Sequence, residues 1–199
     1  MYARKLLPLL LISCAAPLFA EELIPPSDMV KVLQARPVEC VLNEFDNTTC
    51  DAVTEYAFLG SRRGFASGTS LLEIEDDYYV RMTFTDALSV TENGLCSTGN
   101  QSIKDTYLEL VGETAYLGEF RRDELDDDLR TLLEGQVINP MAALLEGAVA
   151  CQQYYYPDGQ HRPNELSYKS FLDGEVIEEG RVLLLTSADA HRIELAPMK

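Results

Sequence analysis

The sequence has no tryptophan, only two histidines and about half as many basic as acidic residues. Its 199 residues include 16 Lys and Arg against 33 Asp and Glu, which gives a formal net charge of −17. A surface this negative repels phosphate backbones and anionic lipid headgroups, so we expect no nucleic-acid binding. A solubilising role explains the charge more simply than a specific cationic partner does.

Long apolar runs are missing after the first twenty residues. The one such run, residues 6–16, follows Arg4 and Lys5 and precedes the small residue Ala20. A basic start, an apolar run of about 7–15 residues and a small residue at the cut are typical of a secretory signal peptide. A membrane-spanning helix needs about 20 apolar residues. We therefore predict a signal peptide over residues 1–20 and no transmembrane segment after its cleavage.

Cleavage at that point leaves residues 21–199, a length that suits a single extracytoplasmic domain with a core of its own. Without Arg4 and Lys5, 14 basic residues face 33 acidic ones, a net charge of −19. An alternative cut precedes Cys14, because residues 11–14 also match a bacterial lipoprotein signal. Acyl chains on Cys14 would then anchor the protein to a membrane. We expect a periplasmic or secreted bacterial protein, with the lipoprotein as the alternative.

Close cysteine pairs are absent too. Zinc sites and catalytic thiol pairs usually need a Cys-x-x-Cys spacing, which the sequence lacks, so we predict no metal site and no cofactor. Four cysteines remain beyond the signal peptide, and an even count in an exported chain favours two disulfides. Three pairings are possible. We favour Cys40–Cys50, which closes a short polar loop, and Cys96–Cys151, which joins distant parts of the chain.

Alternation of apolar and polar residues predicts antiparallel strands toward both ends of the chain. The clearest example is the stretch 78–85, where one face is apolar and the other polar. Asp173 and Gly174 form a good hairpin turn between two later strands. The predicted strands are 53–59, 72–75, 78–90, 103–111, 165–172, 175–187 and 191–195, and the polar stretches 39–51 and 93–100 are predicted loops.

Helical spacing predicts one short helix near the beginning and a pair of helices in the middle. The short helix begins at Ser27 and ends at Arg36, before a proline. Leucines three and four residues apart predict helices over 123–135 and from Asn139 to about Cys151. Strands, helices and strands in this order predict an α+β fold: a single domain with antiparallel strand meanders at both ends, a central helical pair and disulfide bridges.

Two groups of residues are candidates for ligand binding. Tyr154, Tyr155 and Tyr156 form a cluster of amphipathic side chains that suits contacts with a sugar, a peptide or a protein. Arg62 and Arg63 form the most basic spot of an acidic chain and could hold an anion. Plain core or rim positions for the tyrosines, and a solvated loop for the arginines, remain the simpler interpretations.

No pattern of catalytic residues stands out. The serines lack a Gly-x-Ser-x-Gly context, and His161 and His191 are the only candidate bases. The leading hypothesis is a non-enzymatic envelope or periplasmic protein that binds an unknown protein, envelope component or ligand through a sheet face or the tyrosine-rich edge. The alternative is an extracytoplasmic hydrolase whose site no motif reveals.

Overall fold

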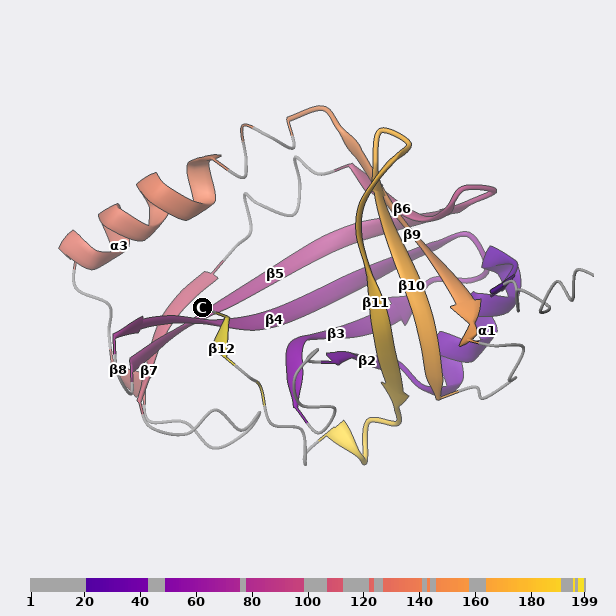
Figure 1. The fold of residues 1–199 in the computed structure, drawn as a ribbon, viewed down its shortest axis with the longest axis horizontal. Helices are drawn as coiled ribbons and strands as arrows, with labels where there is room; N and C mark the ends of the chain where they lie inside the picture. Colours follow the sequence, from indigo (N-terminus) through magenta and orange to yellow (C-terminus); the bar gives the residue numbers. More distant parts are fainter. Residues whose placement is uncertain are drawn as a thin grey trace, which may run out of the picture.

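Eight antiparallel strands close into a barrel in the computed structural model (Figure 1). The structure describes residues 21–42, 49–75, 78–98, 107–112, 122–123, 127–140, 143, 146–157, 164–190, 195 and 197–198. The strands are β1 Glu22–Leu23, β2 Val38–Leu42, β3 Cys50–Phe58, β4 Arg63–Glu75, β5 Tyr78–Thr91, β6 Gly94–Thr98, β7 Tyr107–Gly112, β8 Arg122–Asp123, β9 Val149–Tyr156, β10 Glu165–Leu172, β11 Glu175–Leu185 and β12 Pro197–Met198. The helices are α1 Pro26–Ala35, α3 Asp127–Leu133 and the π-helical turn η1 Glu134–Ile138.

The barrel follows the order β2-β3-β4-β5-β6-β9-β10-β11, and β11 pairs with β2 to close the ring. Each strand therefore neighbours the barrel strand before it in the sequence. β4 and β5 pair along almost their whole length, which makes them the longest pair of neighbouring strands in the barrel. Short turns join several of these neighbours, such as the β10–β11 hairpin, which turns at Asp173 and Gly174, both with positive φ angles. The connection from β6 to β9 is long and contains β7, β8, α3 and η1.

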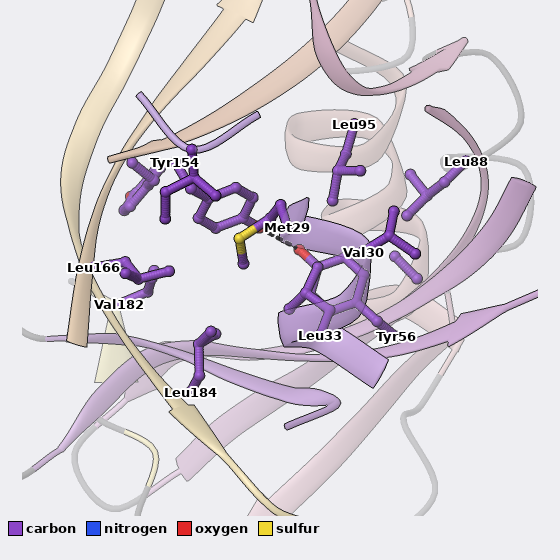
Figure 2. Close-up of a cluster of buried hydrophobic side chains, with 13 residues drawn as sticks. Met29, Val30, Leu33, Tyr56, Leu88, Leu95, Tyr154, Leu166, Val182 and Leu184 are labelled. Carbon is purple, nitrogen blue, oxygen red and sulfur yellow. Dashed lines mark hydrogen bonds between the residues drawn. The ribbon is translucent and has the colours of Figure 1, made fainter. Parts of the chain in front are cut away.

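The barrel interior at one end is filled by α1, which directly precedes β2. Asp28 lies in the first turn of this helix, and Met29, Val30 and Leu33 lie on its buried face. These three side chains pack against inward-facing residues of several barrel strands, including Leu166 of β10 (Figure 2). The helix thus closes one end of the barrel with an apolar plug.

The long β4–β5 hairpin continues beyond the barrel and carries the remaining elements. β7 pairs with the first half of β5, β8 pairs with β7, and β12 runs parallel to β4 (Figure 1). Leu133 of α3 packs on Val80 of β5 in a small separate core. A third cluster lies outside the barrel wall, where Leu71 and Leu195 meet the Cys40–Cys50 bridge.

Both predicted disulfides are confirmed. Cys40 bonds to Cys50 and joins β2 to β3, and Cys96 bonds to Cys151 and joins β6 to β9. The first helix, the strands β5, β10 and β11, and the Asp173 turn also lie close to the predicted positions, whereas β4 begins at Arg63, well before the predicted strand 72–75.

The predicted α+β fold is wrong, because the protein is mostly β and its strands close into one barrel instead of flanking a helical pair. Of the predicted helix from Asn139 to about Cys151, residues 139, 140 and 143 are helical, but residues 149–151 begin β9, so Cys151 lies on a strand. The predicted loops 39–51 and 93–100 contain β2 and β6. Of the predicted last strand, residues 191–194 lie outside the described residues, and Leu195 makes one isolated bridge with Cys50.

The signal peptide and Cys14 lie outside the described residues and stay predictions. Within the described ranges, none of the helices combines the length and the apolar composition that crossing a membrane would take.

Candidate functional site

The barrel contains a cavity of about 360 Å³ in the part of its interior that α1 does not fill. Alternate residues of the surrounding strands point inward and form its wall, because successive side chains of a strand point to opposite faces. The lining residues are Thr54, Tyr56, Ala66, Phe84, Asp86, Leu88, Leu95, Ser97, Ala150, Cys151, Gln152, Ser170, Phe171, Ile177 and Glu178. Ile177 is 58% exposed, so the cavity reaches the surface beside β11.

An aromatic side chain lies across the cavity wall because its neighbour is glycine. Gly68 and Phe84 are directly paired on β4 and β5. A Cβ atom on Gly68 would be 2.1 Å from the Phe84 ring, so any larger residue at this position would push the ring away. The glycine therefore sets the position of Phe84 within the cavity.

Asp86 supplies the wall of the cavity with a buried carboxylate. Its side chain is only 7% exposed, and it accepts a hydrogen bond from the Ser97 side chain. Oδ1 has no hydrogen-bond partner. Burial raises the pKa of Asp86, and the Ser97 hydrogen bond offsets part of that effect. A buried acceptor without a donor destabilises the empty protein.

A second buried carboxylate, Glu39 of β2, lies where the cavity meets the apolar plug. The side chain is 2% exposed, and Tyr154 donates a hydrogen bond to it over 2.5 Å. Tyr56 and Gln152, which line the cavity, each lie 3.4 Å from Glu39 Oε1. The Tyr56 and Tyr154 hydroxyl oxygens are 3.0 Å apart (Figure 2). All polar atoms of this cluster therefore have partners inside the barrel.

Burial dominates the acid–base behaviour of this cluster. It raises the pKa of Glu39 to about 7, although the hydrogen bonds from Tyr154, Gln152 and Tyr56 act in the opposite direction. The pKa values of Tyr56 and Tyr154 also lie well above the ordinary range, first because of burial and then because of the Glu39 charge. The two tyrosines therefore remain protonated hydrogen-bond donors to Glu39.

The structure separates the predicted tyrosine cluster. Tyr154 points into the barrel and is 1% exposed, whereas Tyr155 alternates to the outside of β9. The Tyr155 hydroxyl donates to Gln153, and Lys169 lies 5.4 Å from the centre of its ring. Tyr156 is half-buried and packs against the apolar plug. These side chains do not form one surface.

Arg62 is exposed in the turn between β3 and β4, and the exposed Arg63 begins β4. They do not line the cavity, and their backbone carbonyls accept hydrogen bonds from Val90 and Leu59. His161 and His191 lie outside the described residues. Among the residues that the structure describes, no three His, Cys, Asp or Glu side chains converge in a way that could hold a metal ion.

No motif in the sequence points to Asp86, Glu39 or Phe84 as binding residues. A weak signal for Asp86 exists: in the strand 78–91 it occupies a position on the inward face that is otherwise apolar or aromatic. Glu39 gives a similar signal within the apolar stretch 38–42. A lone acid on an apolar strand face indicates a buried polar site.

Comparison with known proteins adds no further information about the site. No protein family model matches the sequence, and neither the curated proteins nor the solved structures include a match.

Proposed function

We propose that the protein is a non-enzymatic binding protein that holds a small, mainly apolar ligand inside its barrel. Eight-stranded barrels are just wide enough to be filled by side chains or to hold one small ligand. This barrel is filled at the α1 end and hollow at the other. Its cavity of about 360 Å³ falls within the range of about 300–1,000 Å³ that is usual for small-molecule sites. The cavity is the observation that carries the proposal.

The cavity also has the composition of a binding site. Apolar and aromatic side chains such as Phe84 and Leu88 make up much of its wall, and a few polar groups such as Asp86 interrupt it. Apolar walls supply affinity, and single polar groups fix the orientation of the ligand. The sheet face that contacts the ligand would thus be the inner one.

We place this binding protein outside the cytoplasm, as a periplasmic or secreted protein. The two disulfides support this location, because such bonds persist in oxidising compartments. The predicted signal peptide points the same way, and a lipid anchor on Cys14 is the alternative form of the same proposal. The ligand would then be an envelope component or a small molecule from the surroundings.

Binding of the neutral dye N-phenyl-1-naphthylamine tests the proposal, because its fluorescence rises in apolar sites. We expect saturable binding with one site per chain. Ala150→Phe, which adds a ring to the cavity wall, should abolish binding. Ala57→Phe makes the same change on the exposed face of β3 and should leave binding unchanged. Both variants should first show unchanged circular dichroism.

Equal dye binding by both variants would place the dye elsewhere and contradict a cavity site. Absence of any dye binding by the folded wild type would contradict the proposed function itself. The hydrolase alternative has no observation in its favour among the residues that the structure describes.

A further inference from the structure

The charged residues in the described lining of the cavity are all acidic. Asp86 and Glu178 line it, and Glu39 lies directly behind Tyr56 and Gln152. None of the described lining residues is Lys or Arg. Electrostatic attraction in a weakly hydrated space is strong, so this wall disfavours a carboxylate, sulfate or phosphate ligand and favours a positive one.

Asp86 is the group best placed to meet such a ligand. Glu178 already accepts a hydrogen bond of 2.6 Å from Tyr168, and Glu39 is saturated by its tyrosines. Oδ1 of Asp86 is buried without a partner, while the side chain borders the cavity. Because Asp86 itself lines the cavity, a ligand can approach its carboxylate from that side.

Aromatic rings complete the surroundings of a cation. Phe84, Phe171 and Tyr56 all line the cavity together with Asp86. A cation within about 6 Å of an aromatic ring is attracted by the negative face of the ring. One carboxylate and several rings around an apolar space form a typical environment for an ammonium group attached to an apolar body.

We propose that the cavity selects organic cations, namely amines with an apolar or aromatic body whose ammonium group donates a hydrogen bond to Asp86. This inference rests on the proposed function and adds the chemical class of the ligand. The ammonium group satisfies the unpartnered Oδ1, and the body of the amine fills the apolar part of the cavity. A ligand without a donor leaves that oxygen unpaired.

The behaviour of Asp86 agrees with this role. Burial raises the pKa of its carboxyl group in the empty protein, and a bound cation would lower it again. The amine should therefore bind more weakly as the pH falls and Asp86 gains its proton.

The test compares three probes of nearly equal size by isothermal titration calorimetry near neutral pH: phenylethylamine, phenylethanol and phenylpropionate. In the wild type we expect the amine to bind at least tenfold more tightly than the alcohol, a difference of about 1.4 kcal/mol. The carboxylate should bind most weakly. This ranking needs no variant, so it stands even if a substitution impairs folding.

Asp86→Asn keeps the shape of the side chain and removes its charge. It should weaken amine binding about tenfold and leave alcohol binding within about twofold, since only the amine loses the attraction between two opposite charges, and the amide oxygen of Asn can still accept the alcohol O–H. Asp128→Asn is the matched control, because Asp128 is exposed on α3 and distant from the cavity lining. It should change neither affinity.

The outcomes separate the two proposals. Equal affinities for amine and alcohol, or amine binding that is insensitive to Asp86→Asn, would overturn cation selection. If N-phenyl-1-naphthylamine still binds in the cavity, the binding function survives that result. Failure of the dye and of all three probes would overturn both proposals together.

Discussion

The two ends of the barrel are built on different principles. At the α1 end, Met29, Val30 and Leu33 are almost completely buried and fill the interior with apolar contacts. At the other end, Asp86 and Phe84 border empty space. The interior of one barrel is thus divided into a packed half, which stabilises the fold, and a half with a cavity, which is available to a ligand.

The boundary between the halves is polar. Tyr56 of β3 packs in the same cluster as the apolar plug and also lines the cavity, and its hydroxyl group lies within hydrogen-bonding distance of both Glu39 and Tyr154. Such a hydrogen-bond network holds in place the side chains that form this end of the cavity wall. Because all members of the network are buried, the charge that Glu39 gains as the pH rises lowers the stability of the folded protein.

The half of the barrel that contains the cavity gains less stability from packed side chains, and we expect a disulfide bond to supply part of the stability that is missing. The Cys96–Cys151 bridge lies between strand positions that line the cavity, such as Ser97 and Gln152. Replacing both cysteines with alanine should lower the free energy of unfolding by about 4 kcal/mol, because the bridge closes a long chain loop. Urea unfolding measures this loss.

The control for that experiment is the other bridge. Cys40–Cys50 spans 10 residues against 55 for Cys96–Cys151, so the same replacement should lower the free energy of unfolding by about 3 kcal/mol. A larger loss for the short loop would contradict the idea that the cavity depends most on its own bridge.

Substitutions of large apolar residues should distinguish the two ends directly. Leu33→Ala in the plug should lower the free energy of unfolding by about 3 kcal/mol, because fully buried leucines lose both transfer energy and contacts. Phe84→Ala should cost less than half as much, since its side chain is only half-buried and borders the cavity. Dye titration should show the opposite order, with binding lost in Phe84→Ala. Equal stability losses would mean that both ends are packed core.

Local patterns in the sequence predicted many of the strands but not the closed barrel. Alternation is clear in 78–91 and 165–172, where the outward residues are polar and most inward ones apolar. In β2 and β9 the inward positions include Glu39 and Gln152, so the alternation is disturbed and the segments resemble a loop or a helix. The pairing of β2 with β11 joins strands that are far apart in the sequence, and no local pattern encodes it.

The candidate site was missed for the same reason. Most acidic residues of a strand lie on its solvent-exposed face. The weak signal at Asp86 was therefore not enough to distinguish this residue from the many exposed acidic residues of the chain. The tyrosines 154–156 were noticed as a cluster, but a strand sends neighbouring side chains to opposite faces. Only Tyr154 reaches the interior network.

The boundary network gives a predicted effect that depends on pH. Glu39 has a raised pKa of about 7 against 4.5 for the ordinary group. Between these values the native protein holds a proton that the unfolded chain releases, so the free energy of unfolding falls as the pH rises through this window. At about 1.36 kcal/mol for each pKa unit of the shift, the free energy of unfolding falls by about 3 kcal/mol in total, and this fall is complete above pH 7.

Glu39→Gln keeps the size of the side chain and cannot ionise. We expect it to be more stable than the wild type by about 2 kcal/mol at about pH 8, because its amide replaces a buried charge. The amide oxygen still accepts one tyrosine hydrogen bond, and the amide NH2 group can donate to the other tyrosine hydroxyl group. Around pH 4 the two proteins should be similar. Urea unfolding at several pH values checks this, with the exposed Glu134→Gln as control. A wild type whose stability does not fall between pH 4.5 and 7 would contradict the raised pKa of Glu39 and the closed polar boundary on which it depends.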